Sequence, residues 1–192
     1  MFARLRSEFP HFKVVHKSDS PLSHLIDLGL RLITLGAQRQ YLTRYHTVLG
    51  YTLFLPKSWA TTDEVDRVVI LSHERIHLLQ RQKLGMIVFA FLYLVPWLPL
   101  GLAYGRARLE WAAYRETLRA TAELRGLDAA RSRSLKREVV NRFLDGSYGW
   151  MWPFRKQVED WYARLMIELE AEYGADEQAR LRAMTPRQET ST

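Results

Sequence analysis

The chain has 192 residues, no cysteine and a formal net charge of +7. Its length suits one compact domain, and an apolar fraction of 47% excludes a mostly disordered protein. Without cysteine, disulfides and thiolate ligands are excluded, so a metal would have to be held by histidine and carboxylate. The basic residues are spread along the chain rather than gathered in a run, which is typical of solvated helix faces. We therefore expect no specific nucleic-acid partner.

The first part of the chain mixes strands with a helix. Residues 12–15 predict a short strand, and residues 21–35 predict an apolar helix with proline in its first turn. Two segments rich in β-branched and aromatic residues, 41–48 and 51–55, are separated by Gly50. This pattern predicts a β-hairpin.

The rest of the chain predicts helices. Thr61 and Glu64 have capping-box spacing, which predicts a helix from there to about Gly85. Further helices are predicted over residues 105–124, 128–144 and 154–173. The order of strand, helix, hairpin and then helices indicates an α+β fold that is mostly helical, with a small antiparallel sheet packed on the helix after the hairpin. We expect one domain over residues 1–175, followed by a polar tail over residues 176–192.

The segment His73-Glu74-Arg75-Ile76-His77 is the strongest chemical signal in the chain. Imidazoles at positions i and i+4 lie on one face of a helix, which suits two ligands of a single Zn²⁺ ion. Glu74 follows the first imidazole directly. There it could take a proton from a metal-activated water and pass it to a leaving amine.

A catalytic zinc needs a third protein ligand, because its fourth position is kept for water. No histidine follows His77, so a third imidazole would have to come from upstream. Glu110 is the best candidate among the downstream residues. The alternative ligands are the four upstream imidazoles, His11, His16, His24 and His46.

His73-Glu-x-x-His77 followed by Glu110-Trp111-Ala112-Ala113 resembles the gluzincin metallopeptidases. The Glu-x-x-Ala pattern is similar to the ligand helix of the membrane-associated CAAX-processing and HtpX-like proteases. The resemblance implies a minimal zincin-like domain in which His73, His77 and Glu110 hold the zinc and Glu74 is the catalytic base.

The resemblance also raises the question of which groups support the site. Those proteases commonly carry an aspartate where this chain has Tyr114, so the orienting partner of a ligand histidine is expected to be Asp66, Glu64 or a backbone carbonyl. Tyr148 or Tyr114 could donate to the developing oxyanion, the alternative being that each is an aromatic packing residue. The second hairpin strand, with Tyr51, Leu53 and Leu55, is either a substrate-binding edge or a plain core strand.

Residues 86–104 carry no charge and are interrupted by Pro96 and Pro99. Their length is close to the roughly 20 residues of a membrane-spanning helix, but a full span would place His77 and Glu110 on opposite sides of the bilayer. The prolines instead predict an apolar helical hairpin, which either dips into one leaflet of a membrane surface or is buried in the core or in an oligomer interface. Basic residues on both sides suit the inner face of a membrane.

These features together predict a zinc-dependent metalloendopeptidase that acts on a protein or peptide substrate. Residues 1–6 are not an apolar export segment, so we expect a cytoplasmic protein, peripheral to the inner face of a membrane if the hairpin dips into it. The alternative is a membrane-peripheral binding or scaffold protein whose metal is structural or absent.

Overall fold

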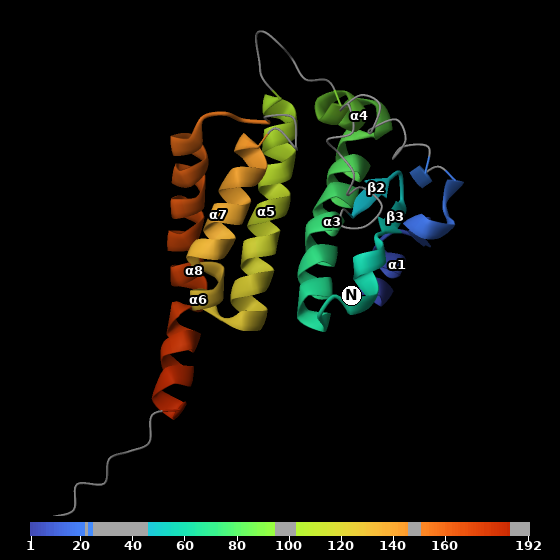
Figure 1. The fold of residues 1–192 in the computed structure, drawn as a ribbon. Coiled ribbons are helices and arrows are strands. Elements are labelled where there is room, and N and C mark those ends of the chain that lie inside the picture. Colours follow the sequence, from blue (N-terminus) through green and yellow to red (C-terminus); the bar gives the residue numbers. More distant parts are fainter. Residues whose placement is uncertain (22, 25–45, 95–102, 146–150, 185–192) are drawn as a thin grey trace, which may run out of the picture. The chain divides into compact units, whose positions relative to one another are not determined.

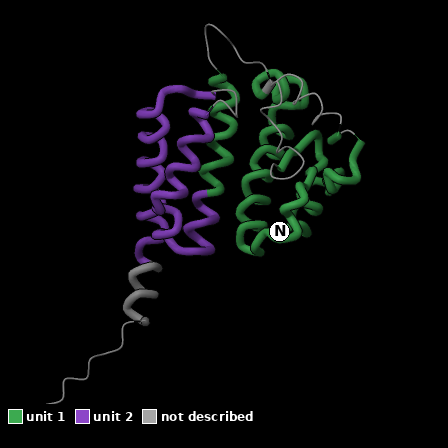
Figure 2. The backbone as a smooth tube through the Cα atoms, in the orientation of Figure 1, with its two compact units in different colours: residues 1–117 green, residues 118–192 purple. Residues whose placement is uncertain are grey.

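The computed structural model describes residues 1–21, 23, 24, 46–94, 103–145 and 151–184 (Figure 1). Contacts between Cα atoms divide the chain into two compact units, Met1–Thr117 and Leu118–Thr192 (Figure 2). The described residues are mostly helical and include one small sheet, which agrees with the predicted α+β class.

The sheet lies in the first unit and has the strand order β1-β3-β2. It consists of β1 (Lys13–His16), β2 (Thr47–Leu49) and β3 (Thr52–Leu55). The hairpin prediction is confirmed, because β2 and β3 pair antiparallel around Gly50, whose φ is 66°. The expectation of an antiparallel sheet is wrong, because β1 pairs parallel to β3. Parallel neighbours need a long crossover, and hydropathy along the chain does not specify where such a crossover returns.

The core of the first unit lies where helix α1 (Phe2–Glu8), the sheet and helix α3 (Glu64–Leu84) meet. Its fully buried side chains include Leu5 of α1, Leu53 of β3 and Leu78 of α3. Two hydrogen bonds from Arg75 to Glu8, of 2.5 and 3.1 Å, also join α3 to α1. The hydrogen bond from Arg75 lowers the pKa of the Glu8 carboxyl.

Helix α3 begins at a different cap from the one predicted. The side chain of Asp63 accepts hydrogen bonds from the backbone N–H groups of Val65 and Asp66, at 3.1 and 3.4 Å. Thr61 instead donates its hydroxyl to the carbonyl of Ser58 within a 3-10 turn, so the predicted capping box does not form. The predicted end of the helix is confirmed at Gly85, whose φ of 78° is accessible to glycine without strain.

Two helices follow α3 in the apolar part of the chain. Helix α4 (Met86–Leu94) contacts α3, and helix α5 (Tyr104–Arg125) begins beside α4. A Cβ added at Gly105 would lie 2.9 Å from the Cδ2 atom of Leu92, so the two backbones approach closely there. Residues 95–102, with both prolines of the predicted hairpin, lie outside the described residues, as does most of the helix predicted over residues 21–35. Within the described ranges, no helix is long and apolar enough to cross a membrane.

The described part of the second unit is mostly helical and contains the end of α5, α6 (Leu127–Ala130), α7 (Arg133–Leu144) and α8 (Arg155–Met184). The single helix predicted over residues 128–144 is divided, because the Ser132 hydroxyl accepts a hydrogen bond from the Leu135 N–H and starts α7. Tyr162 of α8 donates its hydroxyl to the Ala130 carbonyl at 2.6 Å. Helix α8 continues to Met184, so the first part of the predicted tail is helical.

Candidate metal centre

Helices α3 and α5 bring together the three residues expected to bind a metal. His73 and His77 lie one turn apart on α3, and their Nε2 atoms are 3.2 Å apart. The Oε2 atom of Glu110, on α5, lies 3.8 Å from each of these nitrogens. Among the described residues, these three side chains form a group that could hold one metal ion.

Gln80 fixes the orientation of His77. Its side-chain Nε2 donates to the backbone carbonyl of Leu109 at 2.9 Å, which turns its Oε1 atom toward the imidazole. That oxygen lies 3.0 Å from Nδ1 of His77. Since an amide oxygen can only accept, Nδ1 carries the proton, and in the neutral tautomer of such a ring Nε2 keeps its lone pair.

Thr117 orients His73 in the same way. The Thr117 hydroxyl donates to the Ala113 carbonyl at 3.3 Å, which leaves its oxygen to accept from Nδ1 of His73 at 3.0 Å. The second imidazole therefore also presents an unprotonated Nε2 toward the group. Such orienting bonds to the far nitrogen are typical of metal-binding histidines.

The Glu110 carboxylate is held by a residue of the apolar segment. Tyr93, on α4, donates its hydroxyl to Oε1 of Glu110 at 2.5 Å, so Oε2 remains directed at the imidazoles. Burial raises the pKa of Glu110, but the effects of His77, His73 and the bond from Tyr93 are together larger, and the net pKa is lowered. Burial and the Glu110 charge raise the pKa of Tyr93, so the phenol stays a donor.

In the neutral tautomers that Gln80 and Thr117 favour, the three groups present two nitrogen lone pairs and one carboxylate oxygen to each other. Glu110 is 4% exposed and His77 is 7% exposed, so water does little to screen these acceptors. A cation placed among them would satisfy all three at once. This arrangement is what a metal ion requires.

Glu74 lies beside this group on α3. Burial raises the pKa of its carboxyl to about 7, an effect that a protonated His77 opposes and that the Glu110 charge strengthens. Lys17, fully buried after β1 and bonded to the Thr47 hydroxyl at 2.9 Å, lowers the Glu74 pKa more weakly. A bound divalent cation would lower it further, because positive charge favours the carboxylate.

The structure also locates the other residues expected at the site. Tyr114 packs edge-to-face on His73, with ring centroids 4.9 Å apart. Tyr148 lies outside the described residues. Glu64 and Asp66 lie in the first turn of α3, and the orienting role proposed for them belongs to Thr117 and Gln80.

Of the two interpretations of the strand with Tyr51, Leu53 and Leu55, the structure contradicts the substrate edge and agrees with the core strand. Strand β3 lies in the middle of the sheet, with β1 on one side and β2 on the other, so its backbone groups are already paired. The physical reason is again the parallel addition of β1, which covers the side that the hairpin alone would leave open.

Three residues that orient the side chains of the site were not predicted from the sequence. Gln80 follows His77 by one turn, and Thr117 follows Glu110 by two turns on α5, so helical spacing could have indicated both. Tyr93 gave no such signal, because its approach to Glu110 depends on how α4 folds back.

Tyr93→Phe is expected to weaken the binding of a metal ion by about 10- to 100-fold, the usual cost of losing a group that orients a metal ligand. The substitution keeps the ring contact with His77, whose centroid lies 5.9 Å away, and removes only the donor to Glu110. Competition with a chelator of known affinity would measure the change. Tyr104→Phe, at an exposed position of α5, is the matched control, and equal affinities in the two variants would contradict the assignment.

Comparison with known proteins found no match for this chain. No family model matches the chain, and neither the curated proteins nor the solved structures give a match.

Proposed function

We propose that the chain binds Zn²⁺ through His73, His77 and Glu110. The point equidistant from the three ligand atoms lies about 2.1 Å from each, which matches zinc bonds to nitrogen and oxygen of about 2.0–2.2 Å. Two imidazoles and one carboxylate are also the donor set of many catalytic zinc sites, in which a fourth position stays open.

On this basis we propose a zinc-dependent metallopeptidase of gluzincin type, built on a minimal zincin-like domain. Bound zinc supplies Lewis-acid chemistry, which polarises a peptide carbonyl and makes water more acidic. Glu74 is the only one of the site's two carboxylates left to move protons, since Glu110 is engaged by Tyr93 and directed at the imidazoles. Its carboxylate would accept a proton from the attacking water and return it to the amine nitrogen of the leaving product.

The observation that carries the proposal is the convergence of α3 and α5 on one point. The five-residue motif alone supplies two imidazoles, whereas a third ligand requires a second helix to return with a carboxylate in register. That both imidazoles also have their Nδ1 atoms held by oxygens adds a second, independent feature of metal sites.

The zinc-loaded protein is expected to cleave peptides in a broad synthetic library, with products identified by mass spectrometry. Chelation with 1,10-phenanthroline should abolish cleavage, and added Zn²⁺ should restore it, because the chemistry depends on the ion. A protein that binds one zinc per chain yet cleaves no member of the library would favour the alternative function, a scaffold with a structural metal.

A further inference from the structure

Helix α4 has two faces with different surroundings. Phe89 and Tyr93, one turn apart, face the metal centre, and their rings lie edge-to-face against His77 with centroids at 6.4 and 5.9 Å. The same two rings stack on each other at 5.5 Å. This inner face fixes the helix against the site.

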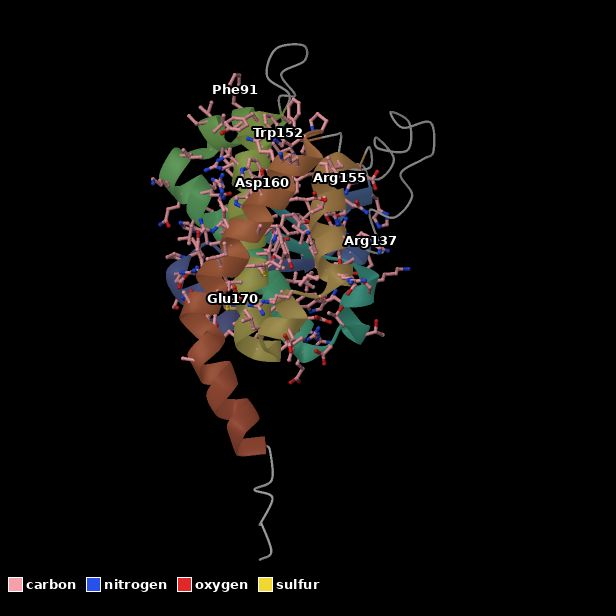
Figure 3. All side chains as sticks on the ribbon, turned by 90° about the vertical axis from the view of Figure 1, so that its left-hand side faces the viewer. Phe91, Arg137, Trp152, Arg155, Asp160 and Glu170 are labelled. Carbon is pink, nitrogen blue, oxygen red and sulfur yellow. The ribbon has the colours of Figure 1, made fainter. Side chains whose placement is uncertain are left out.

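The outer face of α4, which consists of Ile87, Val88 and Phe91, is exposed. Ile87 is 84% exposed, and Val88 and Phe91 are each 48% exposed. Residues 87, 88 and 91 have the spacing of one helical stripe, and Phe91 points away from the ribbon in Figure 3. Three large apolar side chains gathered on so short a helix form an interaction surface rather than scattered exposed residues.

The charged residues that flank α4 in the sequence are all basic. Between Glu74 and Glu110 the sequence has no acidic residue, whereas Arg75, Arg81, Lys83, Arg106 and Arg108 are all basic. Lys83, at the end of α3, and Arg108, near the start of α5, are exposed on either side of α4. The Arg106 guanidinium lies 5.0 Å from the centre of the Tyr93 ring, so a cation also lies against the helix itself.

We propose that the outer face of α4 binds the surface of an anionic lipid bilayer. An apolar stripe with basic residues before and after it in the sequence complements an interface that offers hydrocarbon beneath a layer of negative headgroups. With nine residues, α4 is about 14 Å long, too short to span the roughly 30 Å of hydrocarbon, so it lies in the interface. The inference extends beyond the proposed hydrolysis and does not depend on it. Its consequence is that the metal centre, on the other face of the same helix, sits next to the membrane surface.

Sedimentation with vesicles tests this proposal on the full chain, with no peptide present. The protein is expected to partition onto phosphatidylcholine vesicles that contain phosphatidylglycerol, and Ile87→Ser with Phe91→Ser should lower the partition coefficient by about 100-fold, because two large apolar side chains no longer enter the interface. The matched control replaces two exposed aliphatic residues elsewhere, Leu49→Ser with Ile167→Ser, and should bind as the natural chain does.

A second pair of variants tests the charges. Lys83→Gln with Arg108→Gln should weaken binding to the anionic vesicles about 20-fold and leave binding to pure phosphatidylcholine unchanged. Circular dichroism checks that each variant is folded.

The proposal is overturned if the natural chain stays in the supernatant, or if both serine pairs reduce partitioning equally. It is also overturned if light scattering shows a dimer that only the Ile87→Ser and Phe91→Ser pair dissociates, since the face would then join two copies of the chain. Absence of peptide cleavage would leave the vesicle result unaffected, so the two proposals fail separately.

Discussion

Replacing Glu74 by glutamine is expected to leave one zinc bound per chain and to reduce kcat for peptide cleavage by about 10²- to 10⁴-fold, the usual contribution of a general base. Glutamine has nearly the shape of glutamate but cannot accept the proton of the attacking water. The ligand atoms of His73, His77 and Glu110 are unchanged in this variant, so its metal content should stay the same while its activity falls.

The matched control is Glu64→Gln, at an exposed position in the first turn of the same helix. It makes the same chemical change on α3 at a distance from the site, and kcat should stay at the level of the natural chain. Metal content is measured by atomic absorption and kcat with a peptide found in the library screen. Hydrolysis at an undiminished rate in Glu74→Gln would remove Glu74 from the mechanism.

Glu110→Ala is expected to abolish stoichiometric zinc binding, with a loss of affinity beyond the roughly 100-fold that follows removal of an orienting group. The variant leaves only two imidazoles, which is one protein ligand fewer than a catalytic zinc requires. Because Glu110 is buried and accepts the Tyr93 hydroxyl, Glu110→Gln is made in parallel to keep the side-chain volume and the oxygen that Tyr93 contacts.

Two controls separate ligand loss from general damage. Glu116→Ala removes a carboxylate from the same helix, and His24→Ala removes an imidazole that bonds to the Ser18 carbonyl outside the site. Both should keep one zinc per chain by isothermal titration. Full zinc occupancy in a folded Glu110→Ala protein would show that the ion is held elsewhere.

The proximity of His73, His77 and Glu110 could be predicted because helical spacing indicated the first two residues and the family resemblance indicated the third. Helical spacing places His73 and His77 on one face whatever the rest of the fold does. The pairing with Glu110 came from the Glu-x-x-Ala pattern, and the observed distances of 3.8 Å agree with it. Tyr93 could not be predicted in this way, since its hydroxyl reaches Glu110 through the tertiary packing of α4.

The errors in the fold have a similar origin. Thr61 and Glu64 fit a capping box by spacing, but Asp63 is closer to the helix start and supplies the oxygen instead. Likewise, hydropathy predicted β1 as a strand and gave no information on its parallel partner. A periodic pattern does not specify which of two neighbouring residues caps a helix. It also does not specify which distant strands pair.

Helix α5 belongs to both compact units, because it starts at Tyr104 and ends at Arg125 while the division falls after Thr117. A truncated chain that stopped at this division would end on the residue that orients His73. The last turn of a helix lacks hydrogen-bond donors for its final carbonyls and frays, so Ala113 and Thr117 would lose their fixed positions. The part of α5 beyond Thr117 is therefore expected to keep the His73, His77 and Glu110 group in place, even though it contributes no side chain to that group.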